Sequence, residues 1–504
     1  MLRSSYVLTL ATLLVVPGHS QPSSDKPKFD AADVHASAPA ATNDGFSLRP
    51  GRTEFHGSTL LQMISTAYEI EAAKVFGGPP WLGVNHFDIT AKASAGSSKH
   101  ALNQMLQSLL EERFGLVVHK DERPLPIYVL TVAKGGVKLK ESSTEADPDC
   151  KLNVENNVRT YACRNVTVEN LAERLRLVAA GYFDQLVLDQ TGLKGSYDFA
   201  FSWMPKAFVA SPEGKGMSAF DALEKQLGIK VELKTQPTAG YVVDRINATP
   251  TENPAGTLEK LPPPVTEFEV AEVRPSKAKT DGDADMKNGR LTAIAIPLKD
   301  LISLAYDMDE DMVVCEKWLE TERFDIVAKA APTASLNELR AMLRTLLQER
   351  FKMSVHNEER SVPVFALTAP KKPKLKESDG SARSGCKFGN DNGLRTMTCQ
   401  NATMTQFTES LRRAAGGYID KSVVDLTGLK GSYDVTVGWT PFARLRAKKA
   451  EPTAGGEVPS AAEPAAMLTV FEAIDKQLGL KLAEQKHPMP VLVVDHVERV
   501  PTAN

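Results

Sequence analysis

Long apolar runs are scarce in this chain of 504 residues. The most apolar stretch, 6–16, has eleven residues, whereas a membrane-spanning helix needs about 20. It follows Arg3 and precedes a Pro-Gly pair, which is the order of basic, apolar and small residues in a secretory signal peptide. We therefore expect 1–20 to be removed on export, and we expect no membrane span in the mature chain.

An excess of charge of one sign is also missing. The chain has 60 Lys and Arg against 63 Asp and Glu, a formal net charge of -3. Such a balance supplies no general attraction for nucleic acid or anionic lipid. We therefore predict no nucleic-acid partner.

Familiar catalytic motifs are absent as well. The sequence has no Gly-x-Ser-x-Gly elbow, no His-Glu-x-x-His, no phosphate-binding loop ending in Lys-Ser/Thr and no Cys-x-x-Cys. These motifs place nucleophiles, metal ligands or phosphate-binding amides at the spacing that their chemistry requires. Because these motifs are absent, we predict no catalytic residue, no cofactor and no metal.

Cysteine is rare, with five in the whole chain. Cys150 and Cys163 are thirteen apart, and so are Cys386 and Cys399, at matching places in the two halves. In an oxidising compartment this predicts one disulfide per half, each contributing about 3 kcal/mol. Metal ligation is the alternative, but the close Cys or His spacing of a zinc site is missing. Cys315 is left over and is predicted to be a partly buried free thiol.

A long internal repeat organises what remains. The segment 191–198 recurs letter for letter at 427–434, with Asp189 and Asp425 two residues before each copy. Two glycines favour a tight turn. The residues after the turn alternate apolar and polar, as in a half-buried strand leaving a hairpin.

Other matching segments extend the repeat over most of both halves, so we predict two tandem homologous domains. Strands and helices are mixed without a regular βαβ rhythm. This favours an α+β fold in which each domain has a mixed or antiparallel sheet and about four short helices. The predicted parts are a signal peptide (1–20), a loose N-terminus (21–45), copy one (46–247), a stiff Pro-rich linker (248–265) and copy two (266–504), with a mobile insertion at 443–466.

Copy two shows the expected elements most clearly. Ser335 and Thr403 are predicted to cap helices, with Glu338 and Gln406 completing capping boxes; copy one has Ala101 at the position of Glu338. The other expected elements are strands at 268–273, 324–328 and 491–497, a helix at 298–306, two strands at 352–356 and 362–368 joined by a charged turn, and a last helix ending at Gly479.

Two sets of duplicated polar residues are candidates for chemistry. His119 and His356 fall at equivalent strand ends and could serve as general bases, although a hydrogen-bonded structural histidine is the commoner use. The pairs Asp189 with Asp198 and Asp425 with Asp434 could supply the two carboxylates of a hydrolase. Aspartates beside a turn more often bind local backbone amides.

Aromatic residues give a candidate binding surface. Tyr68, Trp81, Tyr306 and Trp318 could line a groove for a peptide or a glycan. His119 and His356 are counted with them as candidate binding residues. The alternative is that they are core and rim residues of each domain.

A combined pattern of short motifs runs along the chain. It comprises 268–271, 297–306, 318–319, 322–325, 349–351, the repeated Thr-Gly-Leu-x-Gly-x-Tyr-Asp block and 494–498. This pattern resembles an uncharacterised exported family expanded in soil Acidobacteria and known as domain of unknown function 3738. Copy one departs from the pattern at 29–32 and at Asp244-Arg245, where copy two has Asp-His. No activity or cofactor is established for that family. Some relatives are fused to a membrane metallopeptidase of the beta-lactam-sensor antirepressor type, which implies a sensor-like or ligand-binding role outside the membrane.

Three functions are compatible with these patterns. The leading hypothesis is an exported, periplasmic or extracellular, non-catalytic binding or sensor-type module for an unknown envelope ligand or protein, with tandem copies raising avidity. The alternatives are a hydrolase that uses the duplicated Asp and His residues, and a structural protein of an envelope assembly.

Overall fold

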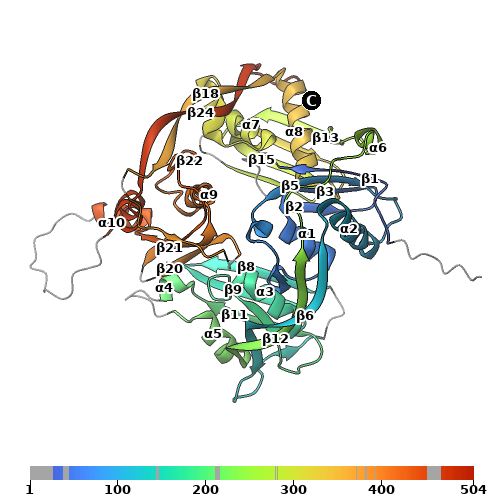
Figure 1. Ribbon diagram of the computed structural model, residues 1–504, viewed down its shortest axis with the longest axis vertical. Helices are drawn as coiled ribbons and strands as arrows, with labels where there is room; N and C mark the ends of the chain where they lie inside the picture. The colour runs from blue at the N-terminus through green and yellow to red at the C-terminus, as the bar shows by residue number, and fades with distance from the viewer. Residues whose placement is uncertain are drawn as a thin grey trace, which may run out of the picture.

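The structure is a computed structural model. The predicted signal peptide lies outside the residues that it describes. Those residues are 26–37, 45–143, 147–209, 216–278, 280, 282–370, 372–380, 383–391, 393–450 and 467–503. The fold is α+β, and each copy consists of two lobes joined by a long two-stranded ribbon (Figure 1).

The first lobe of each copy, the amino lobe, is a four-stranded antiparallel sheet covered by two helices. Strand β5 shows why one face is covered, because Phe87, Ile89 and Ala91 are buried and alternate with more exposed residues. In copy one the elements are β1 (Ala31–Ala36), β2 (Gly45–Leu48), β3 (Arg52–Thr59), α1 (Leu60–Ala67), η1 (Ala72–Lys74), η2 (Pro80–Gly83), β5 (His86–Lys92) and α2 (Lys99–Phe114). In copy two they are β13 (Val270–Pro275), β14 (Asp283–Lys287), β15 (Arg290–Pro297), α7 (Leu298–Tyr306), η4 (Glu310–Met312), η5 (Lys317–Glu320), β17 (Arg323–Lys329) and α8 (Leu336–Phe351).

The second lobe, the disulfide lobe, has its own four-stranded antiparallel sheet and its own core. Trp203 and Trp439 lie at the centre of these cores, each 1% exposed. In copy one the elements are β7 (Lys140–Glu141), β8 (Asp149–Glu155), β9 (Val158–Val166), α3 (Val168–Val178), β11 (Tyr197–Trp203), α4 (Lys206–Val209), α5 (Ala219–Ala222) and η3 (Leu223–Leu227). In copy two they are β19 (Lys376–Glu377), β20 (Gly385–Asp391), β21 (Leu394–Ala402), α9 (Met404–Ala414), β23 (Tyr433–Trp439), α10 (Phe442–Ala450), α11 (Val470–Ala473) and η6 (Ile474–Leu478).

The ribbon of each copy passes from one lobe to the other. Its two long strands are antiparallel, and each gains a short parallel neighbour at one end. One end packs on the amino-lobe core and the other on the disulfide-lobe core, while the polar middle is exposed. The strands are β6 (Val117–Val132), β12 (Ile229–Arg245), β4 (Val75–Gly77) and β10 (Leu186–Asp189) in copy one, and β18 (Ser354–Thr368), β24 (Lys481–His496), β16 (Val313–Val314) and β22 (Val423–Asp425) in copy two.

The predicted helix boundaries in copy two are confirmed. Ser335 and Thr403 each form a complete capping box with Glu338 and Gln406. Gly479 ends the last helical turn in the left-handed conformation, with φ of 68°. These features depend on residues a few positions apart, so the sequence carries them directly.

Four predictions about the strands and connections are wrong. Strand β1 lies inside the stretch 21–45 that was expected to be loose, and it pairs with β5. The stretch 352–368 contains one strand, β18 (Ser354–Thr368), rather than two, because the charged segment pairs with β24 along its whole length. The last strand, β24, begins ten residues before the expected start at 491. The repeated block is not a hairpin, since β10 and β11 belong to different sheets and the block is the turn between them.

The linker and the insertion also differ from the expectation. Part of the stretch 248–265 forms a short helix, α6 (Thr257–Lys260), which lies against β1 (Figure 1). The start of the insertion 443–466 is helical as part of α10, and 451–466 lies outside the described residues.

The four lobes form a closed ring. Figure 1 shows the amino lobe of copy two at the top, that of copy one at the right, and the disulfide lobes at the bottom and left. The two ribbons form two sides of the ring, and contacts between the copies close the other two. Among the described residues, no helix has both the length and the apolarity needed to cross a bilayer.

Candidate functional site

The aspartates before the repeated block cap a turn. The Asp189 carboxylate accepts hydrogen bonds from the Thr191 amide at 2.8 Å and from its hydroxyl at 2.7 Å. Asp425 binds Thr427 in the same way, at 2.9 and 2.7 Å. The turn that follows needs glycine for its backbone angles, since Gly192 and Gly195 have φ of 70° and 99° with open space around them.

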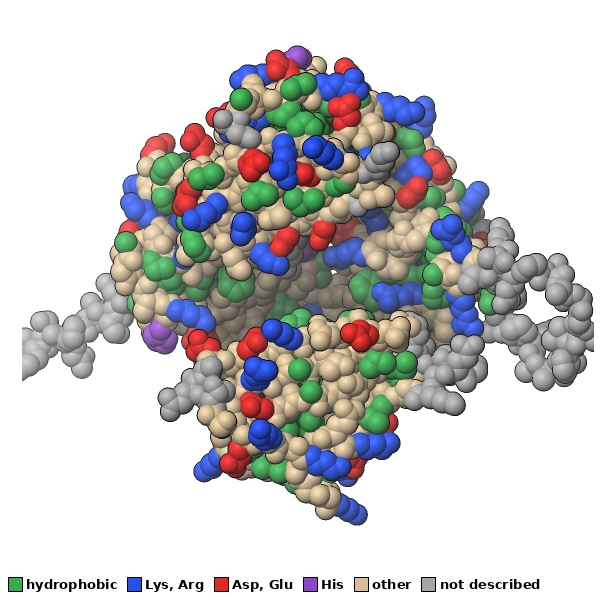
Figure 2. All heavy atoms as spheres, turned by 180° about the vertical axis from the view of Figure 1, so that it is seen from behind, with side chains coloured by type: hydrophobic (Ala, Val, Ile, Leu, Met, Phe, Trp, Pro, Cys, Tyr) green, Lys and Arg blue, Asp and Glu red, His purple; other side chains and the backbone are tan. Residues whose placement is uncertain are grey.

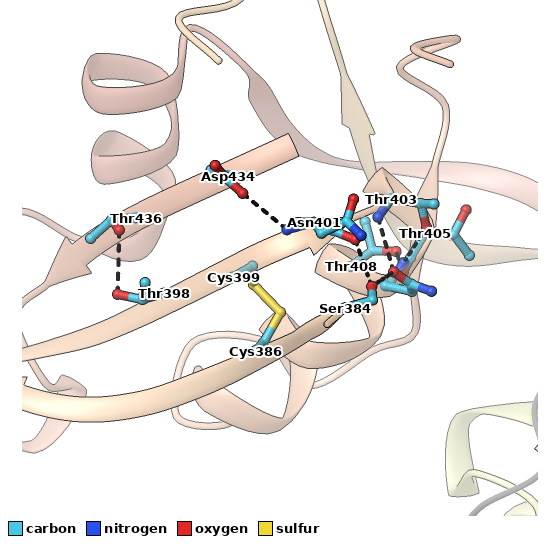
Figure 3. The surroundings of a disulfide bond; sticks show 11 residues. Ser384, Cys386, Thr398, Cys399, Asn401, Thr403, Thr405, Thr408, Asp434 and Thr436 are labelled. Atoms are coloured by element: carbon cyan, nitrogen blue, oxygen red, sulfur yellow. Dashed lines mark hydrogen bonds between the residues drawn. A yellow bond between two sulfur atoms is a disulfide. The ribbon is translucent and has the colours of Figure 1, made fainter. Parts of the chain in front are cut away.

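The aspartates at the end of the block hold a β-bulge. Asp434 accepts a hydrogen bond at 3.0 Å from the amide of Asn401, which has φ of 47° and lies where the register of β21 shifts (Figure 3). Asp198 does the same for Asn165 at 2.9 Å. These amide bonds lower the pKa of both aspartates. In the described residues no hydrogen bond joins the two members of either predicted carboxylate pair.

The amino lobes repeat this device. The Asp88 carboxylate accepts from the Gly57 amide at 2.8 Å, and Asp325 accepts from the Ala295 amide at 2.9 Å. Both amides belong to left-handed residues at a bulge, with φ of 55° and 57°. Each copy therefore has two bulges, and each bulge is held by an aspartate on the neighbouring strand. This structural role explains why these aspartates recur in both copies.

The Asp88 bonds predict a pH dependence. Burial alone raises the pKa of Asp88, but hydrogen bonds from His56, the Gly57 amide and Ser37 outweigh burial and lower the pKa to about 2. Because an unfolded aspartate has a pKa of about 3.9, this stability is present above pH 4 and is lost as the pH falls toward 2. The free energy of unfolding should therefore fall between pH 4 and pH 2 by at most about 2 kcal/mol more in the wild type than in Asp88→Asn. Urea unfolding of both proteins at pH 7, 4 and 2.5 measures this difference. If the free energy of unfolding of the variant depends on pH as steeply as that of the wild type, Asp88 is not the group responsible.

The two recurring histidines form equivalent pairs with aspartates. His119 Nδ1 lies 2.8 Å from Asp244 on the facing ribbon strand, and His356 Nδ1 lies 2.8 Å from Asp495. All four side chains are about half exposed. In copy two Nε2 of the histidine also lies 3.4 Å from Glu358. Among the described residues, neither imidazole hydrogen bonds to a hydroxyl or thiol group.

The four predicted binding aromatics lie at the rims of the amino lobes. Tyr68 and Trp81 belong to copy one, and Tyr306 and Trp318 belong to copy two. Tyr68 packs against Tyr241 with ring centroids 4.5 Å apart, and burial followed by the charge of Glu111 raises its pKa to about 12. Trp81 packs against the core of the same lobe.

Their counterparts in copy two are covered by charged side chains. The Arg344 guanidinium lies 5.7 Å from the Tyr306 ring centroid, and burial raises the pKa of that tyrosine. The indole of Trp318 donates to Glu316 at 2.8 Å, and Arg499 covers its face at 5.4 Å. The structure therefore does not assemble the four aromatics into one groove.

Both predicted disulfides are present, in matching edge hairpins. Cys150 lies directly opposite Cys163 on β8 and β9, and Cys386 lies opposite Cys399 on β20 and β21 (Figure 3). Cys315 is free and half-buried, as predicted, and burial raises the pKa of its thiol. In the described part of the chain no group of three or more His, Cys, Asp or Glu is arranged to hold a metal.

The two amino lobes meet through buried charges. Arg49 of copy one forms an ion pair with Glu338 of α8, whose side chain is only 3% exposed. The Ser335 hydroxyl donates to Glu54 at 2.8 Å, and Arg52 donates to the other oxygen of Glu54 at 2.7 Å. A cavity of ≈ 50 Å³ remains beside these groups. We call this contact the ionic junction.

Arg340 and His56 extend the ionic junction. Arg340 lies 2.8 Å from Asp307 on copy two, and His56 of copy one lies 3.9 Å from the same carboxylate. The ionic junction therefore balances cations and carboxylates that come from both copies, which a buried contact requires.

A second contact joins the disulfide lobe of copy two to the amino lobe of copy one. Arg383 donates to the carbonyl oxygens of Val75 at 2.8 Å and Gly77 at 3.1 Å, and the Ser384 amide donates to Pro80 at 3.2 Å. Burial lowers the pKa of Arg383. Nearby, burial followed by the charge of Arg413 lowers the pKa of His86. We call this contact the arginine latch.

The ring surrounds a hollow. Seen from behind, it opens between the lower lobe and the lobes above it (Figure 2). α4 of copy one lies against β20 of copy two, so the disulfide lobes also touch. The hollow thus exists because the ionic junction and the arginine latch fix the copies relative to each other.

Sequence reasoning missed the residues of both contacts. Arg49 and Glu338 are 289 positions apart, and no local pattern links them. One signal was present, since copy two has Glu338 where copy one has Ala101. A difference between otherwise matching helices can mark a residue used outside its own domain.

Comparison with known proteins places the chain in a family. No curated protein and no solved structure matches it. A family model with the description "Protein of unknown function (DUF3738)" matches 61–246 and 299–497, which lie one in each copy. Together these segments cover more than half of the sequence, so the chain belongs to the DUF3738 family and carries its domain twice.

Proposed function

We propose that this protein is an exported, non-catalytic binding or sensor-type module that holds an envelope ligand within the hollow of its four-lobed ring. The observation that carries the proposal is that buried contacts fix the two copies around that hollow (Figure 2). A preformed concave surface lowers the ordering cost of binding.

The use of the duplicated carboxylates supports a binding role. All four bulge-holding aspartates and both turn-capping aspartates accept hydrogen bonds from backbone amides. Their recurrence is thus accounted for without catalysis. The two disulfides support export, because they persist in oxidising compartments.

Ligand binding tests the proposal. Titration of the full chain with soluble peptidoglycan fragments and fractionated envelope extracts should change the tryptophan emission in a saturable way. A ring-opened variant, Arg383→Ala with Glu338→Ala, should bind at least about tenfold more weakly, because the two walls of the site separate. Equal binding by the ring-opened variant, or no response to any fraction, would contradict the proposal.

The histidine–aspartate pairs support a second candidate function, hydrolysis. In both copies Nδ1 is held by a carboxylate at 2.8 Å and the side chain is exposed, as in a general base oriented by an acid. If this function is correct, a substrate screen should find turnover, and His119→Gln with His356→Gln should lower it by about 100-fold or more. His100→Gln, at an exposed site on α2, is the matched control. Turnover that survives in the double variant excludes these residues.

Exposed edge strands support the third candidate, a role in envelope assembly. Leu152 and Val154 on β8 are 42% and 62% exposed, and Phe388 on β20 is 43% exposed. Apolar edge strands are common points of association. Sedimentation at several concentrations tests this role, and a strict monomer contradicts it.

A further inference from the structure

A groove beside the amino lobe of copy two has an apolar floor and an acidic rim. It lies between β13 and α8 and has a volume of ≈ 290 Å³. Phe268, Met342 and Leu346 form its floor, and Glu267 and Glu349 lie on its rim. Arg350 also lines the groove, and its guanidinium donates to the carbonyl of Ala503. We call it the β13–α8 groove.

Copy one shows what covers the equivalent position. There the groove lies between β1 and α2, has a volume of ≈ 300 Å³, and is bordered on a third side by the linker. The Thr251 amide donates to the Arg113 carbonyl at 2.9 Å, and Asn253 accepts from Arg113 at 2.7 Å and from the Val34 amide at 3.0 Å. The linker then turns into α6, whose Thr257 is buried against β1.

Copy two repeats the anchor in its described residues. Pro250-Thr251 and Asn253 recur as Pro501-Thr502 and Asn504, and the Thr502 amide donates to the Arg350 carbonyl at 2.8 Å. Among the described residues, no segment then crosses β13 and α8. Val270, at the mouth of the groove, is consequently 66% exposed.

The two grooves also differ in charge, since the groove of copy two has a glutamate where that of copy one has a lysine. In copy one, Glu112 of α2 forms an ion pair with Lys28. In copy two the equivalent glutamate is Glu349, and Glu267 occupies the position of the lysine. Neither Glu267 nor Glu349 has an ion-pair partner among the described residues. The groove therefore presents carboxylates that a cation on an incoming segment would complement.

We propose that the β13–α8 groove binds a segment of a partner protein that carries lysine or arginine beside an apolar side chain. The segment lies along β13 and α8 as the linker lies along β1 and α2. Its apolar residue covers Phe268 and Val270, and its cations pair with Glu267 and Glu349. This interface lies on the amino lobe of copy two, outside the hollow of the proposed function, so either assignment can fail alone.

A labelled peptide tests the proposal. The probe has the sequence of linker residues 254–264 with Glu259→Lys, which places two lysines after Leu258, and the comparison peptide has glutamate at both positions. Fluorescence anisotropy with the full chain should show saturable binding of one lysine peptide per chain. Binding of the glutamate peptide should be weaker by about tenfold or more.

Charge-reversal variants locate the site. Glu349→Lys and Glu267→Lys should each weaken binding of the lysine peptide by about fivefold or more. Glu377→Lys, an exposed reversal on the disulfide lobe, should leave it unchanged. Equal binding to all variants, or no binding of the lysine peptide, overturns the proposal. Self-association that Glu349→Lys abolishes overturns it as well, because the occupant would then be a second copy of this chain.

Discussion

Replacing Glu338 by alanine is expected to lower the free energy of unfolding by about 3–5 kcal/mol. Glu338 is 3% exposed and pairs with Arg49 from the other copy. Its removal leaves the Arg49 guanidinium at a dry contact without its carboxylate, and the desolvation cost of that charge remains. Urea or thermal unfolding of the full chain measures the change.

The helix that contains Glu338 is not the source of this cost. Copy one has Ala101 at the same position, and α2 still begins at a Ser98 cap. Loss of a capping interaction alone costs about 1 kcal/mol. Glu472→Ala, which removes the box residue of α11, is therefore the matched control.

A double variant separates charge burial from other effects. Arg49→Met combined with Glu338→Ala removes both charges, so most of the lost stability should return. Small-angle scattering should show a more open particle for Glu338→Ala than for the double variant. If the single variant costs no more than Glu472→Ala, the ionic junction does not hold the copies together.

Replacing Cys386 and Cys399 together by serine is expected to lower the free energy of unfolding by about 3 kcal/mol. The bond closes a loop with a sequence separation of 13, and its loss restores conformational freedom to the unfolded chain. β20 is an edge strand that pairs only with β21 in its sheet, and most of its side chains are exposed.

Hydrogen exchange shows where the disulfide acts. Amides of β20 and β21 should exchange faster in the double variant, while those of α7 and β17 in the amino lobe should keep their wild-type protection. Cys150→Ser with Cys163→Ser should give the same pattern in β8 and β9. Cys315→Ser, which removes the free thiol, is the control. Uniform loss of protection over both lobes would contradict separate lobe cores.

The ribbons show where sequence reasoning reached its limit within one copy. The alternation in 197–203 predicts a half-buried strand, and β11 confirms it with Tyr197 and Trp203 both buried. The charged middle of β18 indicates a turn by composition, yet it is strand. Its backbone pairs with β24, more than 100 positions away, and that pairing does not require burial of its side chains.

The candidate site was less predictable than the fold. Tyr68, Trp81, Tyr306 and Trp318 are residue types that suit recognition, but their neighbours occupy their faces. Composition cannot show which side of a ring is covered. The bulge-holding role of Asp88 and Asp434 was equally hidden, because each amide that they bind is 31 or 33 positions away.

By itself the sequence determined the duplication, the α+β class, both disulfide pairings and the capped helix starts in copy two, because each depends on local spacing or on comparison of the two copies. Only the tertiary structure decided that the copies close into a ring, that the linker docks beside β1 and that no described segment covers the β13–α8 groove. Those features depend on complementary charge and shape between distant segments, and a local pattern contains neither.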